Sequence, residues 1–194
     1  HNPLPTSATI KAKSKVTGLV DKGADKGALI LTERTLKDAE SGLDLATLTS
    51  TTFARGNGGY NGPSDEAPRP HKVPECEPDF AVDLTTLDMA ALIYRLSGDY
   101  NPLHASPSVA RAAGFPKPIL HGLCSLGVAG HAILKGCCDY DAKRLKSLQL
   151  RFSSPVYPGE TMRTEIWRDG ANISFKSKIV ERDVVVLDLS LIHI

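Results

Sequence analysis

The last quarter of the chain constrains the fold most, because apolar and polar side chains alternate there. Four consecutive stretches within residues 145–193 show this alternation: LKSLQLRFSSPV, ETMRTEIWR, NISFKSKIVE and VVVLDLSLI. Short segments containing YPG, DGA and RD lie between them. A period of two is typical of strands with one buried face, and short turns join antiparallel neighbours. The pattern therefore predicts four successive antiparallel strands.

Helical patterns precede these strands. Residues 122–137, GLCSLGVAGHAILKGC, are apolar nearly all round a helix, so we expect a buried helix there. Residues 86–96 place apolar side chains at helical spacing and end at a Ser-Gly pair, while residues 106–115 begin with Ser-Pro and end with Gly. A strand-like FAVDLTT occupies residues 80–86. This order predicts an α+β fold with one antiparallel sheet around a buried helix.

The first part of the chain has a different composition. Residues 9–20 and 28–33 are rich in strand formers and flank a turn-like DKGADKG, which predicts a hairpin. Residues 45–54 continue as a third strand before the glycine-rich RGNGGYNG. No helical pattern accompanies these strands. This part therefore resembles half of a larger unit.

Proline marks the boundary between the two parts. Residues 63–78, PSDEAPRPHKVPECEP, contain five prolines and mixed charge, which favours an extended connection. We therefore expect an N-terminal unit at residues 1–62, a linker at 63–78 and a complete domain at 79–194.

Charge and cysteine content narrow the class of protein. Lys and Arg number 23 against 22 Asp and Glu, so no global field favours nucleic acid or an anionic membrane. The longest apolar runs are too interrupted for a membrane span. The four cysteines form no C-x-x-C pair, and we expect them to be reduced thiols in an intracellular compartment.

The stretch SGDYNPLH, residues 97–104, carries the strongest chemical signal. It follows an apolar helical pattern with Gly and Pro, which impose a tight loop. Asp99, Asn101 and His104 can converge across such a loop. An acid and an imidazole that share a water can remove one proton and deliver another, so the stretch predicts a general acid and base in one pocket.

A second candidate lies in PILHGLC, residues 118–124. His121 and Gly122 stand at the predicted start of the apolar helix, where backbone N–H groups lack partners and the helix dipole favours negative charge. Only glycine lets a substrate oxygen approach this backbone closely. Acid, base and oxyanion donor together suit the addition of water to a conjugated carbonyl compound.

These segments resemble a known family. YRLSGDYNPLHASPSVA at 94–110, GFPKPILHGLCSLG at 114–127 and RFSSPVYPGETM at 151–162 are similar to the hydratase-2 / MaoC-like dehydratase family. The similarity is greatest to the (R)-specific 2-enoyl-CoA hydratase units of peroxisomal multifunctional enzymes. It covers residues 80–194 densely.

The resemblance implies a hot-dog fold, in which an antiparallel sheet wraps a central helix. It implies syn addition of water to trans-2-enoyl-CoA, giving (3R)-hydroxyacyl-CoA, without a metal or redox cofactor. Asp99 and His104 correspond to the catalytic pair, and Asn101 to the residue that orients the water or His104. The Gly122 N–H would bind the thioester oxygen. Tyr94 and His121 are expected beside the pocket.

The resemblance also bears on assembly and compartment. Eukaryotic members carry two hot-dog units, and residues 1–62 resemble only the closing strands of the first one. Pairing with a second unit, within one chain or as a homodimer, is therefore expected. A peroxisomal location is implied, with mitochondrial or cytosolic locations as alternatives.

Several alternatives remain at this stage. The chain could be a non-catalytic acyl-CoA-binding or dimerisation module, or a dehydratase of another acyl thioester such as an acyl-carrier-protein intermediate. Arg55 could meet a CoA phosphate or tie a loop to a carboxylate. The histidines lack the H-E-x-x-H spacing of a metal site, so no metal is expected.

Overall fold

The computed structural model describes residues 1–64 and 71–193. Part of the predicted proline-rich connection, residues 65–70, lies outside the described residues. The chain divides into two units, His1–Arg69 and Pro70–Ile194.

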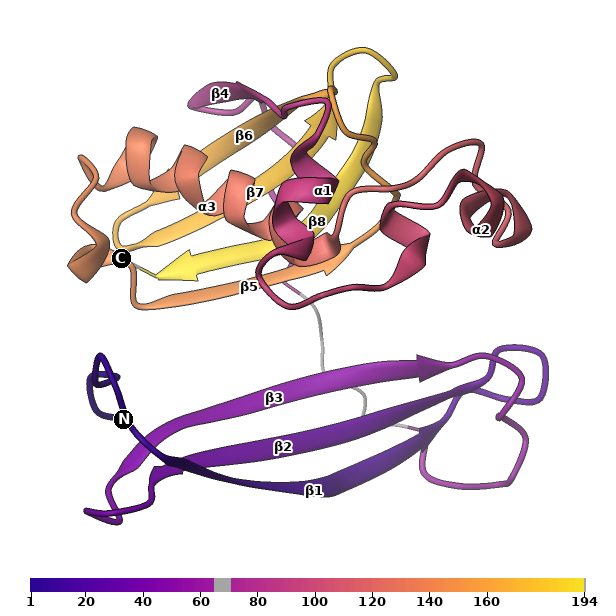
Figure 1. Ribbon diagram of the computed structural model, residues 1–194, viewed down its shortest axis with the longest axis vertical. Coiled ribbons are helices and arrows are strands. Elements are labelled where there is room, and N and C mark those ends of the chain that lie inside the picture. The colour runs from indigo at the N-terminus through magenta and orange to yellow at the C-terminus, as the bar shows by residue number, and fades with distance from the viewer. Residues whose placement is uncertain (65–70, 194) are drawn as a thin grey trace. The chain divides into compact units, whose positions relative to one another are not determined.

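The first unit is a three-stranded antiparallel sheet in the order β1-β2-β3 (Figure 1). Its strands are β1 (Ile10–Asp21), β2 (Ala28–Asp38) and β3 (Asp44–Ala54). The predicted hairpin and third strand are confirmed, but β2 continues past its predicted end at residue 33. Residues 34–38 pair with β1 on one side, and most of them also pair with β3 on the other. Such pairing does not appear in side-chain periodicity.

A buried carboxylate fixes the loops at one end of this sheet. Asp21 Oδ1 accepts hydrogen bonds from the backbone N–H of Gly23 at 2.9 Å and of Gly59 at 2.7 Å. These bonds, with that from Gly59 the largest contributor, lower the pKa of Asp21. A Cβ on Gly58 would overlap the carbonyl oxygen of Gly23, so only glycine fits this approach. The turn after β1 is therefore held against the glycine-rich segment that follows β3.

The second unit contains a five-stranded antiparallel sheet in the order β4-β6-β7-β8-β5. The strands are β4 (Phe80–Thr85), β5 (Ser147–Phe152), β6 (Thr161–Asp169), β7 (Asn172–Ile179) and β8 (Val184–His193). The four predicted C-terminal strands are present, but their successive pairing is wrong at one step. β5 pairs with β8 instead of β6, because residues 153–160 form a connection too long to be a tight hairpin turn.

The helices of the second unit are α1 (Ala90–Arg95), α2 (Pro107–Ala112) and α3 (Gly122–Cys137), with 3₁₀ turns η1 (Pro102–His104) and η2 (Ala142–Arg144). α1 begins later than the predicted start at residue 86. The Thr86 hydroxyl instead donates to the Glu160 carbonyl and accepts from the Gly159 N–H, which anchors it to the 153–160 connection. The predicted stop at Ser97-Gly98 is confirmed, since α1 ends at Arg95 and Gly98 has a φ of 103°.

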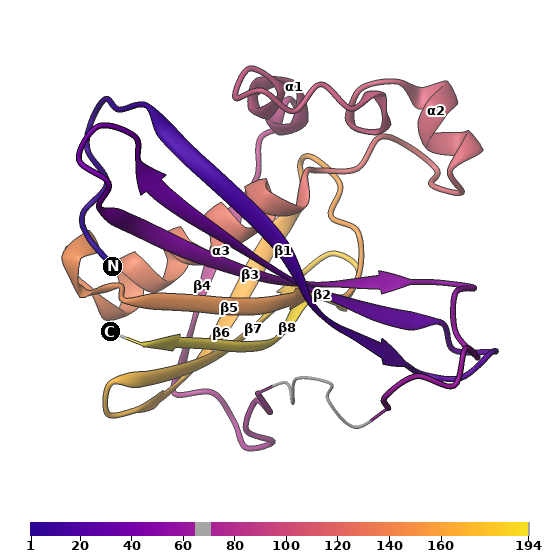
Figure 2. The same ribbon diagram turned by 90° about the horizontal axis from the view of Figure 1, so that it is seen from below.

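α3 covers one face of the five-stranded sheet, and α1 lies beside the N-terminal end of α3 (Figures 1 and 2). Along β6 and β7 every second side chain is buried, as the alternation predicted. The helix packs on this face through Ala129, Ile133 and Cys137. Gly136 lets it approach the ring of Phe80 on β4, where a Cβ would collide. The site residues are carried by the segments that lead into this helix.

The expectation that α3 is buried all round is wrong. Leu123 is 62% exposed, and Gly127, His131 and Lys135 lie along the same solvent-facing side at intervals of four residues. Only one face of the helix packs against the sheet. The opposite face carries small, apolar and polar residues together, and the sequence alone does not show that they are exposed. Within residues 1–64 and 71–193, no helix has the length and apolarity required to cross a membrane.

Candidate active site

The loop after α1 shapes the first part of the site. Gly98 turns the chain with its left-handed φ, and Asp99 follows directly. The Asn101 side-chain oxygen accepts from the Leu103 N–H at 3.0 Å and caps η1, the turn that carries His104. The Asn101 N–H donates to Asp99 Oδ1 at 3.2 Å. Asn101 thus fixes the two predicted acid–base residues relative to one another.

His104 is held in a defined tautomer. Its Nδ1 lies 2.8 Å from the carbonyl oxygen of Ile119, and because a carbonyl only accepts, Nδ1 carries the proton. The other nitrogen, Nε2, then has a free lone pair when the ring is neutral. The side chain is almost completely buried. This arrangement suits a proton acceptor that faces a bound water.

His121 packs against the ring of His104. The two imidazole rings stack with centroids 3.7 Å apart, and the Tyr94 ring lies 4.6 Å from that of His121. His121 is only 2% exposed. Burial lowers its pKa, although the hydrogen bond to the Asp99 carbonyl acts in the opposite direction. The neutral form is therefore favoured in the folded protein.

His121 also contacts the Asp99 loop directly. Its Nε2 lies 3.2 Å from the Asp99 carbonyl oxygen and 3.9 Å from the Asp99 carboxylate. Nε2 must donate to that carbonyl, so Nδ1 carries the lone pair; within the described residues it has no hydrogen-bond partner. His121 thus braces both the ring of His104 and the backbone of Asp99.

A pocket of about 290 Å³ opens at the start of α3. It has an apolar majority with His104 and several small polar residues at its wall, which is typical of a site for a small organic ligand. The residues that line it are His104, Phe115, Ile119, Leu120, Gly122, Ser125, Phe152, Ser153, Ser154, Pro155, Val156, Val186 and Leu187.

The connection after β5 forms one wall of this pocket, and an ion pair holds it. Arg182 Nε lies 2.6 Å from Glu160 Oε1, and Arg182 Nη2 donates to the Pro155 carbonyl at 2.7 Å. Glu160 also accepts from the Tyr157 N–H at 2.8 Å. The wall at residues 153–156 is therefore tied to β7 and β8 through the turn between them.

The structure brings together most of the residues that the sequence singled out, within the second unit. Asp99, His104 and His121 each offer an atom within 4.8 Å of the others. Gly122 lines the same pocket as His104. The other candidates, Asp99, Asn101, Tyr94 and His121, are not among the residues that line it. Arg55 belongs to the first unit, where it lines a different pocket.

Sequence reasoning assigned no role to Phe115, Phe152 or residues 153–156. Phe152 lies against Gly122, where a Cβ would approach its ring at 3.2 Å. The quoted segment RFSSPVYPGE contained the available signal, since a strand that ends in Ser-Ser-Pro must continue as an irregular wall.

The donor set of Asp99, His104 and His121 resembles that of a metal site in composition. Two of the imidazole nitrogens, however, already contact backbone carbonyl oxygens and must carry protons there. A protonated nitrogen cannot coordinate a metal ion. The other nitrogen of each ring, His104 Nε2 and His121 Nδ1, keeps its lone pair, so the expectation of a metal-free site stays a prediction.

Comparison with protein families gives two matches. The family described as MaoC like domain matches residues 70–188, and the one described as MFE-2 hydratase 2 N-terminal domain matches residues 1–56.

Known proteins agree with these matches. The chain is 41% identical over 197 residues to the peroxisomal enoyl-CoA hydratase 2 of Arabidopsis thaliana, covering 96% of this chain and 63% of that protein. The crystal structure of a MaoC-like dehydratase from Phytophthora capsici superposes with a TM-score of 0.89 at 41% identity, covering 98% of this chain and 66% of that one. The chain thus spans less than two thirds of the length of the Arabidopsis protein.

A more distant structure identifies the fold. A Mycobacterium tuberculosis protein with a double hot-dog fold superposes with a TM-score of 0.59 at 15% identity, covering 94% of this chain and 68% of that one. The predicted α+β hot-dog fold is confirmed.

Proposed function

Because the chain belongs to the MaoC-like dehydratase family, we propose that it catalyses the (R)-specific hydration of trans-2-enoyl-CoA to (3R)-hydroxyacyl-CoA, and the reverse dehydration. The observation that carries this proposal is that Asp99 and His104 come within 4.8 Å of one another, and that His104 lines a pocket whose wall also includes Gly122. An acid–base pair and an exposed helix-start N–H are the groups that this chemistry requires.

The proposed reaction divides one water molecule across the C2=C3 bond. The water oxygen forms the new bond to C3, one O–H bond breaks, and the proton that is added to C2 comes from the same acid–base pair. Asp99 and His104 share these transfers in this proposal, since their side-chain atoms come within 4.8 Å of one another. Which of the two accepts the first proton depends on their coupling.

Negative charge develops on the thioester oxygen during the addition. The Gly122 N–H, in the first turn of α3, has no intrahelical partner and stabilises that charge in this proposal. The apolar wall formed by Phe115, Phe152 and Leu187 would hold the first carbons of the acyl chain.

The finer parts of the assignment are also proposals. The substrate is an acyl-CoA of fatty-acid β-oxidation, no further cofactor takes part, and the compartment is the peroxisome. The peroxisomal name of the Arabidopsis relative supports this compartment. Residues 1–62 are the closing strands of a partial hot-dog unit, in line with the match of residues 1–56 to an N-terminal hydratase 2 domain. Pairing of hot-dog units, as a homodimer or within a longer chain, completes the assembly.

The test is turnover by this chain. Loss of the enoyl absorbance of trans-2-decenoyl-CoA, followed by chiral analysis of the product, should give the (3R)-hydroxyacyl thioester. A (3S) product would contradict the proposed stereochemistry. Folded protein that binds the thioester without converting it would instead identify a non-catalytic acyl-CoA-binding module. Faster conversion of an acyl-carrier-protein thioester would change the carrier but keep the chemistry.

A further inference from the structure

The first unit carries a second pocket, of about 490 Å³, at the end of the sheet where Asp21 fixes the loops. Lys22, Asp25 and Lys26 from the β1–β2 turn line it together with Phe53, Arg55 and Gly56 from the end of β3. We call it the loop pocket. The proposed hydration does not use it, and its volume is in the range of small-molecule sites.

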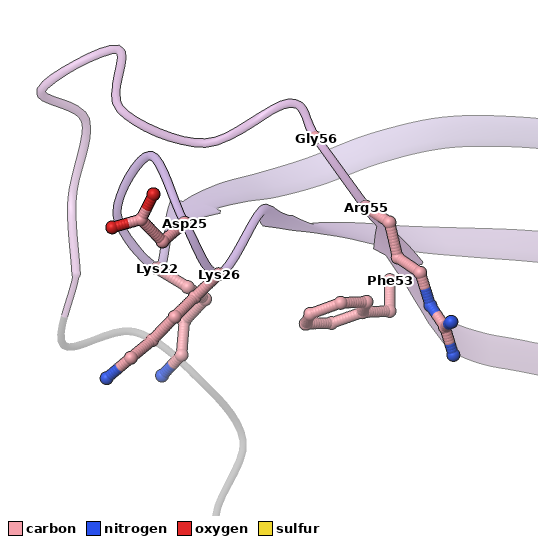
Figure 3. A pocket seen from close by; sticks show the side chains of 6 residues that line it. All are labelled: Lys22, Asp25, Lys26, Phe53, Arg55 and Gly56. Carbon is pink, nitrogen blue, oxygen red and sulfur yellow. The ribbon is translucent and has the colours of Figure 1, made fainter.

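The charges of the loop pocket are unbalanced. It has three cationic side chains and one carboxylate, and Figure 3 shows Lys22 and Lys26 extending in the same direction while the Asp25 carboxylate points away from them. Among the described residues, no carboxylate lies within ion-pair distance of Lys22, Lys26 or Arg55. Neighbouring cations without counterions attract a multiply charged anion.

An aromatic ring lies between the cations. Phe53 is 51% exposed, and in Figure 3 its ring lies between the two lysines and Arg55. An exposed phenyl ring offers a flat apolar face on which a nucleobase can stack. A simple inorganic anion would gain nothing from this ring.

The backbone that presents these side chains is fixed. Asp21 accepts hydrogen bonds from Gly23 in the β1–β2 turn and from Gly59 after β3. Gly27 lies so close to Ala54 that a Cβ on Gly27 would overlap the Ala54 carbonyl oxygen. The Lys22 N–H also donates to the Gly27 carbonyl at 3.0 Å. The cations and Phe53 therefore project from a rigid base, which lowers the ordering cost of binding.

From these observations we propose that the loop pocket binds a purine nucleotide with a phosphate monoester, its phosphate held by Lys22 and Lys26 and its base stacked on Phe53, with Arg55 on the other side of the ring. CoA carries such a group at its adenosine end, and free nucleotides carry it as well. The inference does not require that the chain be a hydratase, because binding is measured without turnover.

Calorimetric titration with adenosine 3′,5′-bisphosphate tests the proposal. The double variant Lys22→Gln/Lys26→Gln should bind at least about tenfold more weakly, because it removes the charge-assisted hydrogen bonds to the phosphate. The matched control Lys11→Gln/Lys13→Gln removes the same charge from β1 outside the pocket and should change the affinity less than twofold. Equal losses in both variants, or no binding by the unaltered chain at millimolar concentration, would overturn the proposal.

A second pair of variants tests the base. Phe53→Ala should weaken binding about tenfold, whereas Leu48→Ala, an apolar residue of the same strand that is 48% exposed, should not. Inorganic phosphate that binds as tightly as the bisphosphate would contradict the stacking role. Titration with CoA identifies the source: binding weakened by Lys22→Gln/Lys26→Gln points to the substrate, and binding of the bisphosphate but not of CoA points to a free nucleotide.

Discussion

The imidazole rings of His104 and His121 stack with their centroids 3.7 Å apart, and each residue also contacts the backbone of the segment that carries the other. His104 donates to the Ile119 carbonyl just before α3, and His121 donates to the Asp99 carbonyl just after α1. The stack therefore joins the loop that carries the acid to the turn that carries the base.

Loss of either proton-transfer group should slow the reaction without unfolding the protein. We expect Asp99→Asn and His104→Gln each to lower kcat by about two to four powers of ten, the usual effect of removing a general acid or base. Asp99 lies on an exposed loop, so its change should leave the melting temperature nearly unchanged. Steady-state kinetics with trans-2-decenoyl-CoA gives the answer. His131→Gln, an exposed histidine on α3, is the control. Unchanged rates in both site variants would refute the assignment.

A side chain added at Gly122 should press against the Phe152 ring. In Gly122→Ala the new Cβ would lie 3.2 Å from the Phe152 ring, at the pocket wall where the thioester oxygen would approach the backbone. We expect kcat/KM to fall by about tenfold or more, part of the cost of losing an oxyanion contact.

Gly127→Ala on the same helix is the matched control for Gly122→Ala. A Cβ at Gly127 meets nothing within 4 Å, so activity should be kept and stability should rise by about 0.5–1 kcal/mol. If both alanine variants lost activity equally, the close approach at Gly122 would not be the cause.

The buried His121 should make stability depend on pH. Burial lowers its pKa from the ordinary value of 6.5, so the unfolded chain binds more protons than the folded one just below that value. Its contribution is fully present above pH 6.5 and is lost as pH falls toward the folded pKa, with a slope of at most about 1.4 kcal/mol per pH unit. Urea denaturation measures the free energy of unfolding at pH 7.5 and at pH 5.5. The decrease between these two pH values should be smaller in His121→Gln than in the unaltered chain, and in His131→Gln it should equal that of the unaltered chain.

The sequence predicted the strands well because their burial alternates. On β6 the buried Met162, Thr164 and Ile166 occupy every second position, which period-two reasoning detects. It could not detect that β5 pairs with β8, because strand order depends on the path of the 153–160 connection. The exposed side of α3 was not predicted for a related reason. Leu123 is apolar whether or not a neighbouring element covers it, so its exposure cannot be read from the sequence.

The candidate site divides in the same way. Asp99 and His104 were predicted because Gly98 and Pro102 dictate a tight loop within a few residues. The tautomer of His104 was not, since it depends on a carbonyl fifteen residues away in the chain. Local chemistry is visible in sequence, whereas contacts made by tertiary packing are not.

Activity should not depend on a metal ion. The Nε2 of His121, which lies 3.9 Å from the Asp99 carboxylate, donates to the Asp99 carbonyl and so cannot coordinate a metal ion together with that carboxylate. Prolonged treatment with EDTA followed by assay should leave kcat unchanged. Loss of activity that Zn²⁺ restores, in a preparation whose melting temperature also rises with Zn²⁺, would contradict this prediction.

The ion pair between Glu160 and Arg182 should contribute more to the stability of the fold than the one between Asp83 and Arg163, although both are bidentate. The Glu160 side chain is 12% exposed, whereas that of Asp83 is 42% exposed. Removing one partner of a largely buried pair leaves the other charge poorly solvated, and we expect Glu160→Gln to cost about 1–3 kcal/mol. Asp83→Asn should cost less than about 1 kcal/mol.

The two ion-pair variants should also differ in substrate binding. Arg182 holds the Pro155 carbonyl in the pocket wall, so its release in Glu160→Gln should raise KM, while Asp83→Asn should leave KM unchanged. Urea denaturation and enoyl-CoA kinetics on the same preparations measure both effects. Equal destabilisation with equal KM would mean that the wall is held by its own packing. A larger KM in Glu160→Gln alone would show that this ion pair positions the wall against which the acyl chain rests.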